Sequence, residues 1–276
     1  MNRWVSNTIC VGLELEYEGV SYMTVQEAYD ATFTKRLLSF SDDGSLRPRR
    51  MNTEIKFSGP LSGELIDEAL AQVATLLSTH RHHISWRCGM HVHVDCRGVE
   101  FVRPYRSAIL ATLLEPILFA WDGTGRQENK FCQSIVDSVY AYLPAIARDG
   151  RPAFPQLTKY SLLNLRSLFE LGTLELRFAG STDEMARVID FMNIGMGLRE
   201  ASAGFSSGEE LVVSVLETPS LSQWIERHTH PLFAEQLVPI AEAGRHVMPT
   251  LASMNAALAL VEYEQHLKPT IIGGHI

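Results

Sequence analysis

The segment Cys88–Asp95 reads Cys-Gly-Met-His-Val-His-Val-Asp and places two imidazoles and a carboxylate at alternating positions. Residues two apart in a β-strand point to the same face of a sheet. We therefore expect His91, His93 and Asp95 to share one face, with the intervening valines packed beneath them. Imidazole and carboxylate groups are common metal ligands, so this strand is the first candidate for chemistry.

Two other segments have the same design. Glu14 and Glu16 alternate with apolar residues near the N-terminus, and Glu175 and Arg177 do so far along the chain. Oxygen-rich ligation suits Mg²⁺ or Mn²⁺, and the forked guanidinium of arginine suits phosphate. If the three strands lie side by side in one sheet, their polar face is a site for hard cations and phosphate.

Each segment also has an alternative interpretation. The N-terminal glutamate pair could lie on the solvated face of an edge strand, and the glutamate–arginine pair could be a cross-strand ion pair. His91 and His93 could pack at a strand end, or they could open a zinc hydrolase site. The usual zinc hydrolase motif, His-x-His-x-Asp-His, fails because Cys96 stands in place of the last histidine.

Basic residues supply candidates for binding an anion. Arg126 and Lys159 lie near junctions between predicted elements, and each is a candidate phosphate contact. Arg47 follows a predicted turn at 41–45 and could clamp an anionic substrate or lie in a solvated loop. The chain has no P-loop and no Gly-x-Gly-x-x-Gly segment, so nucleotide binding of the Walker or Rossmann type is not supported.

Hydrophobic periodicity predicts the elements that position these residues. Strands are predicted at 9–17, 52–57, 89–95, 161–169 and 173–178, the last two forming a hairpin through Gly172. Helices are predicted from a capping box at Thr24–Glu27 to about residue 33, and over 62–79, 104–121, 131–146 and, in several pieces, 183–267. We expect a loop at 151–155 and a loosely held tail at 268–276. This order predicts an α+β fold.

Composition limits the classes of function. The 276 residues are enough for one large domain or two, and a net charge of −8 argues against a dominant role in binding nucleic-acid phosphates. The four cysteines include no Cys-x-x-Cys pair and follow no apolar leader, which predicts reduced thiols in a cytoplasmic protein. No apolar run approaches the ~18 residues of a membrane span.

The three polar strands together resemble the glutamine synthetase and glutamate–cysteine ligase superfamily, most closely its phage and bacterial amidoligase branch. Glutamine synthetases carry a Glu-x-Glu strand, a Gly-Met-His-x-His segment and a Glu-x-Arg-Phe strand, in that order. Residues 14–16, 89–93 and 175–178 are similar to these. Further segments similar to the amidoligase branch are Gly12 to Glu16, Asp43-Gly44-Ser45, Glu54 with Ser58-Gly59-Pro60, Arg126 with Asn129, Phe131 and Cys132, and Lys159-Tyr160 with Asn164.

The resemblance covers about residues 8–200 and departs from the family where Gly59 separates Ser58 from Pro60 in the substrate loop. It implies a curved, mostly antiparallel sheet with helices on its outer face, as in the glutamine synthetase catalytic domain. Residues 1–200 would form the amidoligase-like catalytic core, and residues 201–276 a helical extension packed on it.

The resemblance also implies roles for residues. One Mg²⁺ or Mn²⁺ ion would be held by Glu14, His91 and Glu175, and another by Glu16 and Glu54. ATP would be bound by Lys159, Asn164, Arg126 and Arg177. Substrate contacts would come from Asp43, Ser45, Arg47 and His93. Glu54, Arg177 and Arg126 would act in catalysis.

The implied activity is an ATP- and Mg²⁺-dependent carboxylate–amine ligase that forms an amide bond through an acyl phosphate. The alternatives are a zinc-dependent hydrolase using His91 and His93, and a catalytically inactive binding protein on the same fold. The implied partners are ATP, a carboxylate and an amine, which could be amino acids, peptides or modified nucleotides or bases. We expect no membrane partner. The sequence leaves open whether nucleic acid binds directly and whether a homo-oligomer forms.

Overall fold

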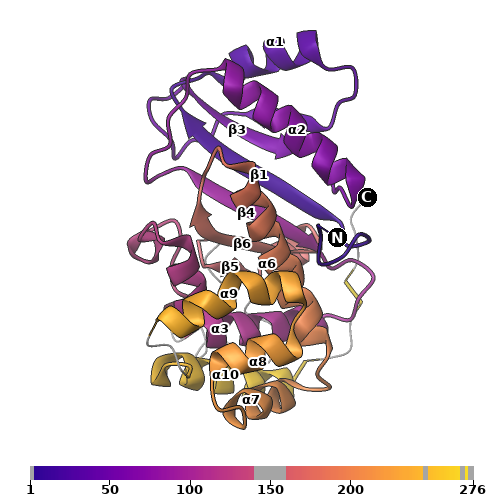
Figure 1. Cartoon of the computed structure of the whole chain (residues 1–276), viewed down its shortest axis with the longest axis vertical. Coiled ribbons are helices and arrows are strands. Elements are labelled where there is room, and N and C mark those ends of the chain that lie inside the picture. The colour runs from indigo at the N-terminus through magenta and orange to yellow at the C-terminus, as the bar shows by residue number, and fades with distance from the viewer. Residues whose placement is uncertain (1–2, 140–159, 245–247, 268–270, 273–276) are drawn as a thin grey trace.

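The computed structural model describes residues 3–139, 160–244, 248–267 and 271–272, and its architecture is α+β. Six strands form one sheet in the order β2-β3-β1-β4-β6-β5, with antiparallel pairing between all neighbours in the described residues (Figure 1). The strands are β1 (Val11–Glu18), β2 (Leu38–Ser41), β3 (Asn52–Phe57), β4 (Gly89–Asp95), β5 (Leu163–Asn164) and β6 (Thr173–Gly180). The predicted α+β class is confirmed.

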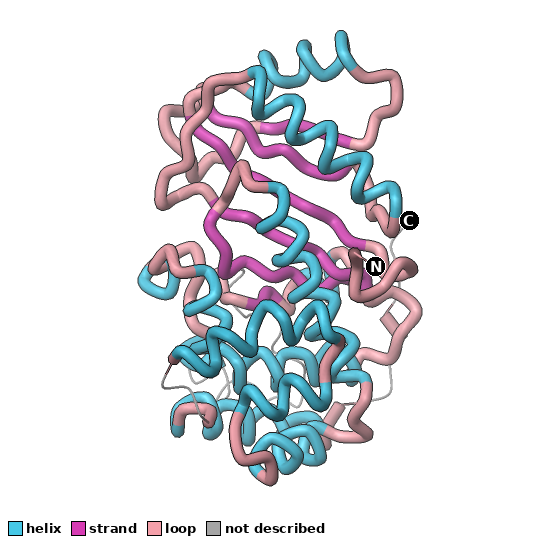
Figure 2. The backbone as a smooth tube through the Cα atoms, viewed as in Figure 1, coloured by secondary structure: helices cyan, strands magenta, loops and turns pink. Residues whose placement is uncertain are grey.

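Helices cover one face of this sheet and gather beyond its lower edge (Figure 2). They are α1 (Tyr22–Thr32), α2 (Glu64–Thr79), α3 (Val102–Asp122), α5 (Ser167–Glu170), α6 (Met185–Ala203), α7 (Gly208–Leu216), α8 (Leu221–His228), α9 (Pro231–Ala243) and α10 (Leu251–Glu264), with a 3-10 turn η1 (Arg126–Glu128).

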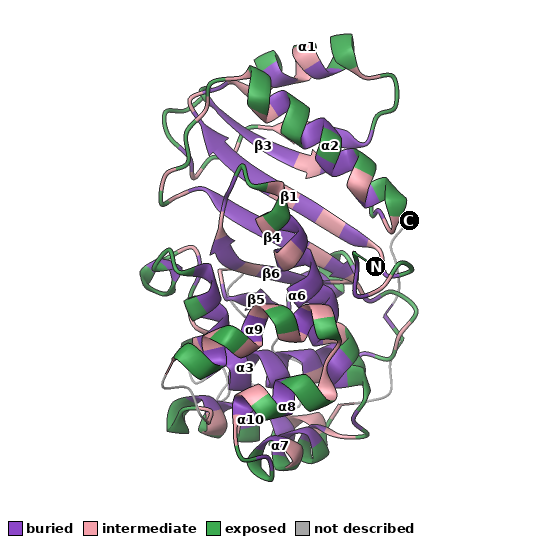
Figure 3. Ribbon diagram, in the orientation of Figure 1, coloured by how far each residue is buried: buried purple, intermediate pink, exposed green. Residues whose placement is uncertain are grey.

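The alternation predicted for the strands separates a core face from a polar face. On β1 the side chains of Leu13, Leu15 and Tyr17 are at most 2% exposed. Helix α6 approaches the same face closely, because a Cβ added at Gly195 would lie 2.9 Å from Val94 Cγ2. The strands and the inner sides of the helices are buried, while α1 and α2 expose their outer sides (Figure 3). The opposite face of the sheet carries the charged residues.

The C-terminal helices pack around α3, which is buried on almost all sides. Tyr105 of α3 donates from its hydroxyl to the Leu260 carbonyl at 2.7 Å. Arg106 forms an ion pair of 2.6 Å with Glu264 of α10. These contacts tie the last helices to α3, although the domain boundary at residue 200 stays a prediction.

Two of the predicted elements differ from the structure, and one strand was missed. Ser21, not Thr24, caps the first helix, because its side chain accepts from the Met23 amide at 3.2 Å. Strand β2 was not predicted. The strand predicted at 161–169 is reduced to β5, since the Asn164 side chain accepts from the Arg166 amide at 3.0 Å and turns the chain into α5. The hairpin through Gly172 therefore contains a short helix.

Parts of other predictions lie outside the described residues. Of the helix predicted at 131–146, residues 135–139 are helical and 140–146 are outside the description, as is the loop at 151–155. The tail is attached to the core at its described residues, which corrects the prediction for that part. The Ile272 amide donates to the Val99 carbonyl and the Ile272 carbonyl accepts from Gly98, both at 3.0 Å.

Candidate functional site

Strand register brings the acidic residues and histidines that were predicted to form a site onto one polar face of the sheet. Glu14 of β1 lies opposite His91 of β4, and Glu16 lies opposite Glu54 of β3. On the other side of β4, His93 lies opposite Glu175 of β6. The three segments identified in the sequence are therefore neighbouring strands β1, β4 and β6, and β3 adds a fourth acidic residue.

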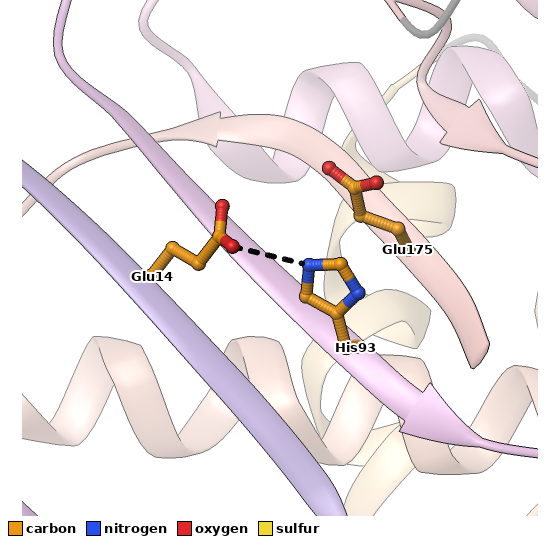
Figure 4. Close-up of side chains that lie close together, drawn as sticks. All are labelled: Glu14, His93 and Glu175. Carbon is orange, nitrogen blue, oxygen red and sulfur yellow. Dashed lines mark ion pairs between the residues drawn. The ribbon is translucent and has the colours of Figure 1, made fainter. Parts of the chain in front are cut away.

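Glu14, His93 and Glu175 form the first cluster, in which one ligand atom from each side chain lies within 4.8 Å of the others. The three side chains converge from β1, β4 and β6 (Figure 4). His93 Nε2 is 3.6 Å from Glu14 Oε1, and His93 Nδ1 is 3.0 Å from the Thr173 hydroxyl. Two carboxylates and one imidazole form a donor set that suits a divalent cation.

The charges of this cluster stabilise one another. Burial favours a neutral Glu14, but its hydrogen bond to His91 and its ion pair with His93 hold its pKa well below the ordinary value. Burial likewise opposes the charge on His93, and the neighbouring Glu14 and Glu175 carboxylates outweigh it and raise the pKa of His93. The pKa of Glu175 is lowered because the His93 and Arg177 charges outweigh its burial.

Glu175 is held by two neighbours. Asn164 Nδ2 donates to Glu175 Oε2 at 2.6 Å, and the Arg177 guanidinium pairs with Oε1. Asn164, predicted to bind ATP, thus orients a carboxylate of the first cluster, and its Oδ1 accepts from Arg166. Its proposed contact with the nucleotide stays a prediction.

His91 lies beside this cluster and is 3% exposed. Its Nδ1 is 3.1 Å from Glu14 Oε2. Burial and the nearby Arg177 charge lower the pKa of His91, which favours its neutral form. The resemblance implies that His91 completes the first metal site and that His93 contacts substrate, whereas the clustering places His93 with Glu14 and Glu175. Both assignments stay predictions.

The second cluster consists of Glu16, Asp43 and Glu54, again with ligand atoms within 4.8 Å of one another. Burial raises the pKa of Glu16 to about 8, against the hydrogen bond of 2.6 Å that the Gly89 amide donates to it. A Cβ at Gly89 would lie 2.8 Å from His91 Nε2, so only glycine permits this approach.

Glu54 is the best-connected carboxylate of the second cluster. Its Oε2 accepts from the Ser41 hydroxyl and from Lys56 Nζ, both at 2.8 Å. Burial and the Glu14 charge raise the pKa of Glu54 despite these contacts. A divalent cation would relieve this accumulation of carboxylates, which is otherwise costly to bury.

Two guanidinium groups with buried Nε atoms face the second cluster. Arg126 and Arg177 line a cavity of about 280 Å³ together with Glu16, Asp43 and Ser45. Arg126 Nη1 donates to the Cys88 carbonyl at 3.0 Å. The Nε atoms of both arginines are buried and have no hydrogen-bond partner among the described residues. Because a buried N–H without a partner is costly, these donors indicate an anionic ligand.

One predicted residue does not take part in this arrangement. Arg47 is exposed and does not line the cavity; its Nη1 donates to the carbonyls of Gly44 and Leu46 at 3.2 and 3.0 Å. A direct substrate contact from its side chain is therefore not seen. Lys159 lies outside the described residues.

Sequence reasoning missed other residues of the site. Lys56 has the same-face spacing from Glu54, which could have identified it. Arg87 lines the cavity but precedes the β4 pattern by two residues, so no sequence signal separates it from a solvated arginine. Asp43 was predicted to contact substrate, and only the folding of its loop places it beside Glu16 and Glu54.

Comparison with known proteins finds no matching family model, curated protein or solved structure. Among the helices that the structure describes, none has the length and apolar character needed to cross a membrane. The geometry of the two clusters and the two arginines is therefore the feature of this protein that indicates a function.

Proposed function

We propose that this protein is an ATP- and Mg²⁺-dependent carboxylate–amine ligase of the amidoligase type. The observation that carries the proposal is the juxtaposition of two carboxylate clusters with two arginines whose buried Nε atoms have no partner among the described residues. A triphosphate with divalent cations would satisfy both features, because the cations neutralise the carboxylates and the arginines bind the remaining oxygens. The antiparallel sheet is compatible with the curved, glutamine synthetase-like sheet that the resemblance implies.

The proposed reaction has two steps. An oxygen of the substrate carboxylate attacks the γ-phosphorus of ATP, and the bond between this phosphorus and the ADP oxygen breaks. The amine nitrogen then attacks the acyl carbon, phosphate leaves, and the nitrogen loses a proton as the amide forms. Activation by phosphate is needed because a carboxylate oxygen is a poor leaving group.

The residues of the polar face have distinct proposed roles. Glu14, His93 and Glu175, with His91 beside them, would hold one cation, and Glu16, Asp43 and Glu54 another. When bound, Mg²⁺ or Mn²⁺ neutralises phosphate charge. Arg126 and Arg177 donate N–H groups toward the phosphate or carboxylate oxygens. Glu54 is our candidate for receiving the amine's proton, because it clusters with Glu16 and Asp43, which line the charged cavity, and burial raises its pKa.

A thermal-shift titration tests the proposal. The protein is heated with a non-hydrolysable ATP analogue, with and without Mg²⁺, and separately with zinc alone. We expect stabilisation that requires analogue and Mg²⁺ together, since a ligand that binds only the folded state raises its apparent stability. Stabilisation by zinc alone would contradict the ligase and favour the hydrolase, and no response to any ligand would favour an inactive protein.

A further inference from the structure

Trp86 is the exposed member of the four tryptophans. Its side chain is 60% exposed, whereas Trp4, Trp121 and Trp224 are 2%, 8% and 0% exposed. A large aromatic residue on the surface is uninformative alone, but one beside a site often marks a binding surface. Trp86 comes just before β4, three residues from Gly89.

Trp86 and Phe131 form an aromatic wall, and a cationic side chain lies over each of the two rings. The Trp86 ring stacks with Phe131 at a centroid distance of 6.3 Å. Arg87 lies 4.4 Å above the Trp86 ring, and Lys130 lies 5.0 Å above the Phe131 ring. Asn129 fixes the wall, because its Nδ2 donates to the Trp86 carbonyl at 2.8 Å and its Oδ1 accepts from the Phe131 amide at 2.9 Å.

A cavity of about 530 Å³ lies against this wall. Its lining combines Trp86 and Ile84 with the Ser181 hydroxyl, which is buried and has no hydrogen-bond partner in the described part of the chain. Arg126 lines both this cavity and the charged cavity of about 280 Å³. The two cavities therefore adjoin at a buried guanidinium whose Nε lacks a partner.

We infer that this cavity binds the aromatic ring of a carboxylic acid whose carboxylate lies on Arg126. That the acid is a substrate rests on the proposed function; that the cavity binds it rests on the geometry alone. An arginine that faces both cavities lets one ligand place its charge in the polar cavity and its ring against Trp86. The ring of the ligand buries apolar area and stacks against the indole of Trp86. Its carboxylate accepts a charge-assisted hydrogen bond from Arg126.

Acrylamide quenching of tryptophan fluorescence tests this directly, because Trp86 is the tryptophan that a neutral quencher can reach. The Trp86→Phe variant defines the signal of the three buried tryptophans. The full chain is titrated in the presence of Mg²⁺ with 3-phenylpropionate, 3-cyclohexylpropionate and 3-phenylpropionamide. Protection of Trp86 from quenching reports occupancy without requiring turnover.

We expect 3-phenylpropionate to protect Trp86 at the lowest concentration. The cyclohexyl acid, which keeps charge and size but lacks a π-system, should bind about two- to tenfold more weakly. The uncharged amide should bind more than about tenfold more weakly. Arg126→Gln should remove the advantage of the acid over the amide, whereas Leu251→Ala, at a 77% exposed position of α10, should change nothing.

Equal protection by acid and amide would overturn the anchoring on Arg126, and equal protection by phenyl and cyclohexyl acids would overturn the aromatic preference. Stronger protection by the ATP analogue than by 3-phenylpropionate would assign the wall to the nucleotide and also overturn the inference. A protein that fails the Mg²⁺–nucleotide test but shows the expected order would contradict the ligase and support the aromatic-acid site. The reverse result would overturn this site alone.

Discussion

Burial raises the pKa of Glu16 to about 8, so in the metal-free protein this carboxyl group holds a proton at pH 7. Glutamine has the same shape and no charge, so Glu16→Gln should leave the melting temperature without metal unchanged. The same change removes an anionic ligand from the second cluster. We expect the stabilisation by Mg²⁺ with ATP analogue, and ATP turnover, to be lost.

Glu18→Gln is the matched control for this experiment. Glu18 lies on the same strand and face and is also buried, but it belongs to neither cluster. It accepts from the Arg47 amide at 2.6 Å instead. Its substitution should keep the nucleotide response. A Glu16→Gln variant that retains most turnover would contradict the proposed metal site.

The two histidines of β4 can be distinguished by Mn²⁺ binding, measured by electron paramagnetic resonance. Because His93 clusters with Glu14 and Glu175, His93→Asn should weaken Mn²⁺ binding at this first cluster by more than about 100-fold. His91 contacts only Glu14 of this cluster, so His91→Asn should cost nearer to tenfold, as for a neighbour of a ligand. The opposite order would support the assignment that the resemblance implies.

At the scale of elements, Glu115 joins α3 to the segment that follows η1. Its carboxylate accepts from the Ser134 hydroxyl at 2.7 Å and from the Ile135 amide at 2.5 Å. These bonds anchor the end of the loop that carries Arg126. Burial raises the pKa of Glu115 to about 6 from an ordinary value of 4.5. Because the folded state binds this proton more tightly, its stabilising contribution is present below pH 4.5 and is lost as the pH rises through 6.

Glu115→Gln should therefore change the pH dependence of folding. Between pH 4 and pH 8, the free energy of unfolding of the variant should rise relative to that of the unsubstituted protein by on the order of 2 kcal/mol. The reason is that the glutamine has no proton to lose. Urea unfolding of both proteins across this range measures it. A difference that does not vary with pH would contradict the raised pKa.

At the scale of the whole molecule, the helices after residue 204 complete the core around α3. Ile109, Leu110, Leu113 and Leu114 of α3 are fully buried. Removing α7 to α10 would expose the side of α3 on which they pack. We expect a chain of residues 1–204 to show no cooperative thermal transition by circular dichroism. A cooperative melt would instead support an independent core with a separable extension.

Sequence alone determined the elements whose signal is local. The period of two in 9–17, 52–57 and 89–95 predicts these strands and the face that each carboxylate and imidazole occupies. The region 183–267 was predicted as helical, without the bounds of its separate helices. Strand β2 was missed because its four residues carry too little periodic signal. The turn after Asn164 was missed because β5 has only two residues and because a side-chain hydrogen bond turns the chain there.

Only the tertiary structure decided which residues meet. Strand register places Glu14 opposite His91 and His93 opposite Glu175, and the register shifts between Met90 and Val92, where β4 meets Arg177 of β6. Such a shift changes which side chains are neighbours across the sheet, but it does not change the alternation of apolar and polar residues along each strand. Asp43 and Arg87 enter the site through loop closure. Local sequence sets the face of a strand, whereas neighbours across a sheet depend on pairing between distant segments.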